Sequence, residues 1–217
     1  MTKFKTVSLA DQVYEKLEND IITGVYPRGE HLTELKLVEQ LGVSRTPIRE
    51  ALRRLEHERL VADTGKGVVV LGITVDDLID IMQIREKIEG LAAYYATKNM
   101  TPEGSAELNR VCELQDFYHS KRDLEHLRRM DDMFHDVLYE LSGRAVIQDT
   151  LLPLHRKTQR YRKIAMEDGN RLASTIEEHK QIYRAAASGN AELAAELMTR
   201  HIQNATEHMI ARFEYHG

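Results

Sequence analysis

Residues 42–56 read GVSRTPIREALRRLE, and this stretch decides how the N-terminal third of the chain is interpreted. A glycine–valine turn precedes Ser44, which is placed to cap a helix that runs to about Glu58. Pro47 falls in the first turn of that helix, where its missing N–H removes no intrahelical hydrogen bond. A shorter helix is predicted just upstream, over residues 34–41. Two short helices joined by a tight turn form a helix-turn-helix, whose second helix enters the major groove of DNA.

The second helix carries the side chains that such a role requires. Arg45, Arg49 and Arg53 recur every four residues, so they share one face of the helix. Arginine is the side chain that matches guanine O6 and N7 with two hydrogen bonds. The hydroxyls of Ser44 and Thr46, together with the helix N-terminus, suit phosphate oxygens. A solvated arginine face on an ordinary surface helix is the alternative, and the spacing alone leaves both interpretations open.

A β-hairpin is predicted directly behind the helix-turn-helix. Two apolar segments, residues 60–62 and 68–71, flank a glycine-bounded basic tip. The tip consists of Gly65, Lys66 and Gly67. The hairpin supplies a wing, so we expect residues 1–74 to form a winged helix-turn-helix module that binds double-stranded operator DNA.

The pattern changes to long helices after a junction at residues 72–74. The helices are expected over residues 75–98, 102–120, 121–141, 145–167, 171–187 and 190–214. Pro153 is expected to kink the fourth of these helices or to split it near Leu151. The predicted fold is therefore mainly α, with the winged module followed by an all-α domain over residues 75–217.

Composition favours a cytoplasmic protein without a membrane segment. The apolar run at residues 68–71 is far shorter than the roughly 20 residues that span a bilayer. The N-terminus has no signal-peptide core, and the single cysteine, Cys112, fits a reducing compartment. The net charge is −5, but residues 1–70 hold 11 basic and 11 acidic residues and are neutral. A local basic face is thus compatible with an acidic chain.

A second set of polar residues lies on the apolar stripes of the long helices. On the third long helix, periodicity places Asp131 and His135 on or beside the buried stripe and Asp132 on the polar face. His179 and His201 fall on the inner stripes of the last two helices. One carboxylate and three imidazoles suit a divalent transition metal such as zinc or nickel. Separately satisfied core histidines are the alternative.

Arg85 is a candidate effector-binding residue. It lies on the stripe of Ile81, Ile84 and Ile88, so a cation faces the apolar side of its helix. An unpaired buried cation is costly, and the carboxylate of a bound effector would be a suitable partner. A pair with Glu89, four residues on, or a dimer contact would serve equally well.

The N-terminal third resembles the GntR-type winged-helix transcriptional regulators. The matching segments are GVSRTPIREAL (42–52) with RLE (54–56), YPRGEHL (26–32) and the wing GKGVVV (65–70). The resemblance implies that Arg45, Thr46 and Arg49 contact bases and phosphates, and that the wing tip reaches a groove or the DNA backbone. Two positions depart from the pattern, since Arg59 replaces a usual glycine and Leu35 stands where some members have arginine.

The helical part is similar to the FCD effector domain of the FadR subfamily. The similarity lies in DDMFH (131–135), LSG (141–143), EH (178–179), GN (189–190) and HI (201–202), and in Arg85 and Glu89. It implies a bundle of six to seven helices, a homodimer, and a metal held by Asp131, His135, His179 and His201. Members of this family commonly respond to small organic acids, whose carboxylate would bind at open positions of the metal.

These observations predict a ligand-responsive regulator rather than an enzyme. We expect a repressor that a small carboxylate effector releases from its operator. One alternative is a metal-responsive regulator in which the ion itself is the signal. A metal-dependent enzyme is the other, but no general base accompanies the predicted ligands, and the Glu-x-x-His pattern of common metalloenzymes is absent.

Overall fold

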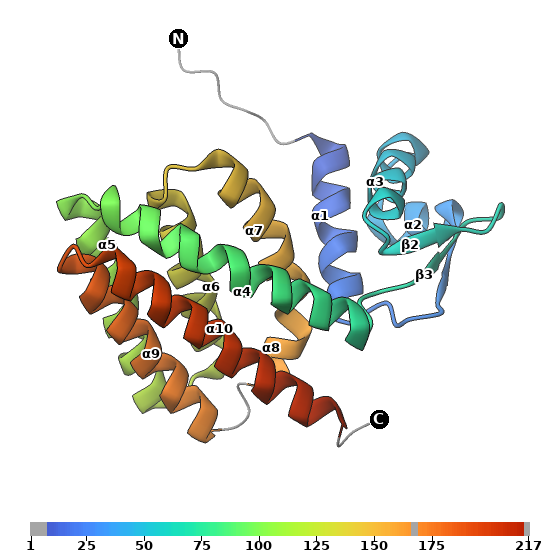
Figure 1. Ribbon diagram of the computed structural model, residues 1–217. Helices are drawn as coiled ribbons and strands as arrows, with labels where there is room; N and C mark the ends of the chain where they lie inside the picture. The colour runs from blue at the N-terminus through green and yellow to red at the C-terminus, as the bar shows by residue number, and fades with distance from the viewer. Residues whose placement is uncertain (1–7, 166–168, 215–217) are drawn as a thin grey trace, which may run out of the picture. The chain divides into compact units, whose positions relative to one another are not determined.

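The structure is a computed structural model that describes residues 8–165 and 169–214 (Figure 1). The chain divides into two compact units, Met1–Thr74 and Val75–Gly217. The first contains short helices and a small sheet, and the second is helical throughout its described part. The predicted fold class, a winged helix-turn-helix followed by a helical bundle, is confirmed.

The N-terminal unit has the predicted helices and one strand more than predicted. Its elements are α1 (Leu9–Ile22), β1 (His31–Leu32), α2 (Glu34–Leu41), α3 (Arg45–His57), β2 (Val61–Asp63) and β3 (Val68–Val70). The sheet order is β1-β3-β2, and both pairings are antiparallel. Gly42 ends α2 with φ 67°, a left-handed conformation that glycine adopts without steric cost. That turn brings α2 and α3 together as the helix-turn-helix.

One apolar core holds the N-terminal unit together. Leu17 of α1, Leu37 of α2 and Ile48 of α3 pack with Leu32 and Val70 of the sheet. On α3, the buried residues Ile48, Leu52 and Leu55 recur at helical spacing, so the opposite face is left to solvent. The core therefore fixes which face of α3 carries the arginines.

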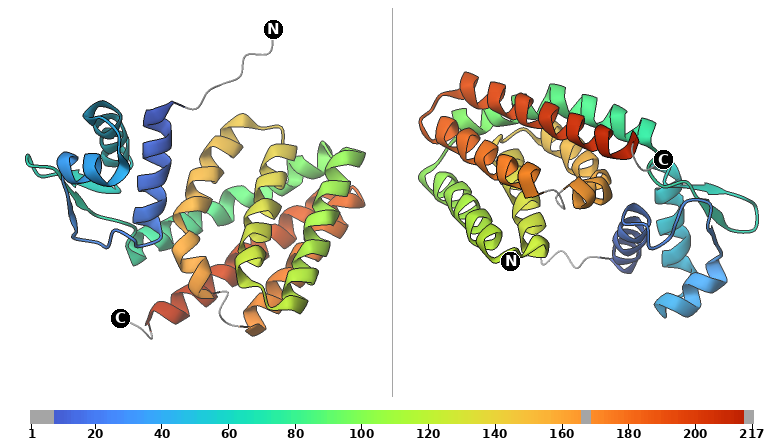
Figure 2. Two further views of the ribbon diagram at one scale, coloured as in Figure 1. Left: turned by 180° about the vertical axis from the view of Figure 1, so that it is seen from behind. Right: turned by 90° about the horizontal axis from the view of Figure 1, so that it is seen from below.

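The C-terminal unit is a bundle of seven described helices. They are α4 (Val75–Lys98), α5 (Pro102–Lys121), α6 (Leu124–Leu141), α7 (Ala145–Lys157), α8 (Gln159–Ala165), α9 (Gly169–Ala187) and α10 (Ala191–Glu214). The long helices α4 and α10 lie side by side, and α9 packs along α10 (Figures 1 and 2). None of the described helices has the length and apolar character that a bilayer span requires.

Two predicted helix boundaries are wrong. The helix expected over residues 145–167 is interrupted at Thr158 and not near Leu151, and its last residues, 166–168, lie outside the described part of the chain. Pro153 is accommodated inside α7, between the buried residues Leu151 and His155. Burial on both sides of the proline stabilises the helix against the loss of one backbone hydrogen bond.

The third long helix starts later than expected. Helix α6 begins at Leu124, because Asp123 caps it by accepting a hydrogen bond from the His126 amide at 3.1 Å. The predicted inner stripe holds for Leu127, Phe134 and Leu138, which are buried. Leu124, at the start of that stripe, is exposed. The same inner face carries Asp131 and His135 into the interior of the bundle.

Candidate functional site

Three imidazoles from three helices meet inside the C-terminal unit. His135 comes from α6, His179 from α9 and His201 from α10, and all three are buried. One ring nitrogen from each lies within 4.8 Å of the others, and Nε2 of His179 is 3.4 Å from Nε2 of His201. Oδ1 of Asp131 is 3.8 Å from Nε2 of His179. The structure thus brings together the four side chains that the sequence selected as metal ligands.

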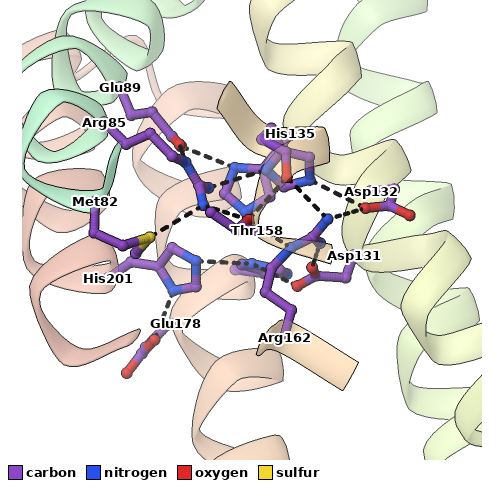
Figure 3. A network of polar contacts seen from close by, with 12 residues as sticks. Met82, Arg85, Glu89, Asp131, Asp132, His135, Thr158, Arg162, Glu178 and His201 are labelled. Atoms are coloured by element: carbon purple, nitrogen blue, oxygen red, sulfur yellow. Dashed lines mark hydrogen bonds and ion pairs between the residues drawn. The ribbon is translucent and has the colours of Figure 1, made fainter. Parts of the chain in front are cut away.

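Each imidazole is held from behind at its Nδ1 atom. The Nδ1 partners are Glu89 Oε2 for His135 at 2.9 Å, the Gln115 amide for His179, with Oε1 at 3.1 Å and Nε2 at 2.9 Å, and Glu178 Oε2 for His201 at 2.7 Å. Figure 3 shows the first and last of these contacts. A proton on Nδ1 that is donated outward leaves the Nε2 lone pair free to face the centre. Histidine ligands of protein-bound metals are held in this way.

The protonation states favour ligation. Burial lowers the pKa of His179 and of His201. His135 lowers both further, and burial outweighs the hydrogen bond to Glu178 that raises the pKa of His201, so both rings are neutral near pH 7. Burial alone would raise the pKa of Asp131, but the Arg162 guanidinium outweighs it and holds that pKa below its usual range. Neutral imidazole and ionised carboxylate are the forms that bind a metal ion.

Arg162 of α8 holds the far side of the predicted carboxylate ligand. Its Nη1 atom donates to Oδ2 of Asp131 at 2.5 Å, and its Nη2 atom donates to Oδ1 of Asp132 at 2.6 Å (Figure 3). Asp131 therefore keeps Oδ1 on the side of the imidazoles. Sequence reasoning placed Asp132 on the polar face, and its side chain is indeed more exposed than that of Asp131, at 33% against 6%.

Arg85 is hydrogen-bonded to other side chains of the protein. Its Nε atom donates to Oε1 of Glu89 at 2.6 Å, and its Nη atoms contact Oγ1 of Thr158 at 3.2 Å and Nδ1 of His155 at 3.0 Å. The pair with Glu89 is one of the alternatives that the sequence left open. The expected stripe is not intact, because Ile84 is exposed. Arg85 also lines the cavity beside the centre, so its predicted role toward an effector remains compatible with its position.

His155 belongs to the same hydrogen-bond network, but both of its ring nitrogens are hydrogen-bonded to side chains other than the three clustered imidazoles. Its Nδ1 atom accepts a hydrogen bond from Arg85, so its Nε2 atom carries the proton and donates to Oδ1 of Asp132 at 3.1 Å. Burial and the nearby cations Arg162 and Arg85 lower its pKa well below the usual value. Both ring nitrogens are used within the protein, which separates His155 from the three predicted histidine ligands.

A cavity opens beside the imidazole cluster. It is lined by Arg85, Asp131, His135, Arg162, Ala165, Arg171, Leu172, Thr175, His201, Ile202, Ala205 and Met209. Two of the predicted metal ligands on α6 and one on α10 reach its wall. The sequence prediction missed Arg171 and the supporting role of Glu178, although Glu178 immediately precedes His179.

The predicted DNA-contacting residues lie on one surface of the N-terminal unit. Arg45, Thr46, Arg49 and Arg53 are exposed on α3, as are Ser44 before it and Gly65 and Lys66 in the wing, whereas Gly67 is half-buried. A groove runs between α3 and the wing, and its walls include all of these residues except Ser44 and Thr46. The Arg49 Nε atom donates to Oε1 of Glu34 at 2.7 Å, and Glu34 also lines this groove. This arrangement matches what a major-groove helix and a wing require.

Two family models match the chain in succession. The model described as "Bacterial regulatory proteins, gntR family" matches residues 9–70, and the model described as "FCD domain" matches residues 80–204. The chain belongs to the GntR family of bacterial regulators and carries an FCD domain. Both predicted resemblances are thereby confirmed.

Individual relatives agree with this assignment. The Uxu operon regulator of Haemophilus influenzae is 32% identical, over 89% of this chain and 79% of that protein. The HTH-type transcriptional repressor RspR of Escherichia coli is 24% identical, over 93% of this chain and 89% of that protein. The solved structure of E. coli McbR/YncC superposes with a TM-score of 0.81 at 25% identity, covering 96% of this chain and all of the other. Because the chain belongs to this family, it is a DNA-binding transcriptional regulator and not an enzyme.

The buried Arg85–Glu89 pair gives a prediction for stability. Replacing Arg85 with Met leaves the Glu89 carboxylate buried without its cation, so we expect a loss of about 3–5 kcal/mol in the free energy of unfolding. Urea unfolding followed by circular dichroism measures it. Arg110→Met is the control, because Arg110 forms an exposed pair with Glu107 whose loss should leave the free energy of unfolding nearly unchanged. Equal stabilities for the two variants would contradict a structural role for Arg85.

Proposed function

We propose that this GntR-family regulator is a repressor whose affinity for its operator is lowered by a small organic acid bound at a metal ion in the FCD domain. The observation that carries the proposal is the geometry of the three imidazoles. One ring nitrogen of each lies within 4.8 Å of the others, the Nε2 atoms of His179 and His201 are 3.4 Å apart, and Glu89, Gln115 and Glu178 contact the Nδ1 atoms. Neutral core histidines without a common ligand would not need this convergence.

The donor set fits a divalent transition metal such as zinc or nickel. Three imidazole nitrogens and Oδ1 of Asp131 would hold the ion, and the separation of 3.4 Å between the His179 and His201 nitrogens suits two metal–nitrogen bonds of about 2.1 Å. When bound, the ion supplies open coordination positions for the carboxylate of an acid. Arg162 contributes by keeping Asp131 ionised and by restraining its other oxygen.

A homodimer is proposed for the functional form. An exposed apolar row on α4 supports it, because Ile84 and Leu91 are 44% and 48% exposed and lie seven residues apart on the helix. Val146, on the neighbouring helix α7, is 80% exposed. A second copy would cover these side chains and place two α3 helices in successive major grooves of a near-palindromic operator, about one helical turn apart. An acid shifts the equilibrium between the DNA-bound and the free regulator only if it binds these two forms with different affinities.

Fluorescence anisotropy on an operator selected from random duplexes tests the proposal. The metal-loaded protein should bind the operator, and a member of a panel of small acids should weaken binding by a factor of 5–150, the usual range of allosteric coupling. The metal-stripped protein should lose the response to the acid. Control of DNA binding by the ion alone, with no response to any acid, would replace the proposal with a metal sensor.

The arginine face of α3 gives a second prediction. Arg49→Ala should weaken specific operator binding by about 1–3 kcal/mol, because Arg49 is proposed to contact a base with two hydrogen bonds. Binding of unrelated duplex DNA should change much less. Arg110→Ala, which removes an exposed arginine from the other unit, serves as the control. Unchanged operator affinity in the Arg49 variant would remove this residue from base recognition.

The Nδ1 partners give a prediction for metal affinity. Glu178→Gln removes the negative charge that polarises His201, and we expect metal affinity to fall by about 10- to 100-fold. Competition with a chromophoric chelator measures it. Glu177→Gln is the matched control on the same helix, because the exposed Glu177 pairs with Arg184 outside the site. Equal metal affinities for the two variants would contradict the role of Glu178.

The apolar row on α4 gives a prediction for assembly. Leu91→Glu places a charge in the proposed dimer contact, and sedimentation velocity should show a monomer at concentrations where the wild type is a dimer. Leu193→Glu, an exposed leucine on α10 outside this row, should remain dimeric. A dimeric Leu91→Glu variant would mean that this row is not the contact.

A further inference from the structure

We infer that the cavity beside the imidazole cluster selects acids that carry one negative charge and an apolar tail. The inference rests on the proposed function and specifies the class of effector. It follows from two observations, namely that every arginine of the cavity already contacts a carboxylate of the protein, and that the wall beyond the cluster is apolar.

The three cavity arginines are engaged by the protein's own acids. Arg85 contacts Glu89 at 2.6 Å. Arg162 contacts Asp131 and Asp132 at 2.5 and 2.6 Å, and Arg171 contacts both oxygens of Glu178 at 2.7 and 3.0 Å. Among the described lining residues, these arginines are the only cationic side chains. A second carboxylate on a ligand would find each of them already paired.

The charge balance of these groups favours a monoanion. The three guanidiniums contact four carboxylates, Glu89, Asp131, Asp132 and Glu178, which leaves one negative charge. A divalent ion would convert it to one positive charge. One carboxylate from an effector then neutralises the site, whereas a dicarboxylate would leave a net negative charge in a largely buried space. Such a charge is costly where water and free cations are lacking.

The apolar wall extends from the cluster along α10. Ala205 and Met209 follow His201 at steps of four residues, so they lie about 6 and 12 Å from it along the helix axis. Leu172 of α9 and Ile202 of α10 complete this wall, and Thr175 contributes a hydroxyl. The tail of a bound acid would contact these side chains. Each methylene buried against them should tighten binding by about three- to fourfold.

Calorimetric titration of the metal-loaded full chain tests both features. The probes are straight-chain monocarboxylates from acetate to octanoate and dicarboxylates of matching length. We expect pentanoate to bind at least about tenfold more tightly than pentanedioate, and affinity to rise by about three- to fourfold per methylene until the tail reaches the end of the wall. Three results would overturn the inference. A dicarboxylate could bind as tightly as the monocarboxylate of the same length, the affinity could be independent of chain length, or no acid could bind.

A variant on α10 locates the tail. Ala205→Leu narrows the wall one turn beyond His201, so the gain in affinity with chain length should disappear. Ala211→Leu makes the same change at an exposed position of the same helix and should keep the gain. A gain that survives in Ala205→Leu would overturn the assignment of this wall.

Metal analysis distinguishes a failure of the proposed function from a failure of the inference about the class of acid. Elemental analysis after loading and dialysis reports whether the FCD domain holds an ion at all. A chain without metal overturns the proposed function and the inference together. A chain with bound metal that prefers dicarboxylates or ignores tail length overturns the inference alone and leaves the metal-anchored effector in place.

Discussion

The pairing of buried charges is the constraint on which the helical domain depends. Arg85 and Glu89 are fully buried, and Arg162 and Asp131 are nearly so, at a point where α4, α6 and α8 meet. An isolated charge in such a place would destabilise the fold by several kcal/mol, so each charged group needs a partner on a neighbouring helix or turn. Arg85 and Glu89 pair within α4, and Glu89 also contacts His135 of α6 at 2.9 Å. Arg162 of α8 pairs with Asp131 of α6, so these contacts connect three helices and hold His135 and Asp131 in place. Structure and site are built from one network.

The hydrophobic periodicity of the sequence was enough to predict most of the fold and the residues of the imidazole cluster. On α6, the spacing of Leu127, Phe134 and Leu138 was enough to choose Asp131 over Asp132 as the inward carboxylate, because a helix repeats its facing every three to four residues. The same argument placed His179 and His201 inward from α9 and α10. The winged module was equally accessible, since its turn, cap and arginine spacing are all local features.

What sequence reasoning missed depends on contacts between distant segments. The two-residue strand β1 has no periodicity of its own and exists because it pairs with β3. The sequence allows Arg162 to line the pocket but does not fix its partners, because Arg162 lies after an interruption at Thr158, where the angular phase of α7 does not carry over to α8. The choice of Glu89 as the partner of Arg85 needed the bundle, because the spacing allowed other partners equally well. Long-range packing decides all three.

The two sites of this regulator use charge in opposite ways. On α3 the arginines are exposed, and even the contact between Arg49 and Glu34 lies at the surface, where an ion pair is weak and exchanges readily for a phosphate or a base. In the FCD domain each described arginine of the cavity is held by a carboxylate, and its side chain is at most 13% exposed. The imidazoles are also held at Nδ1 by the protein itself, so their positions do not depend on an ion. An ion that enters such a preformed cluster would require little rearrangement. Its binding energy would remain available to stabilise the folded domain and to hold a ligand, in contrast to small zinc modules that fold only around their metal.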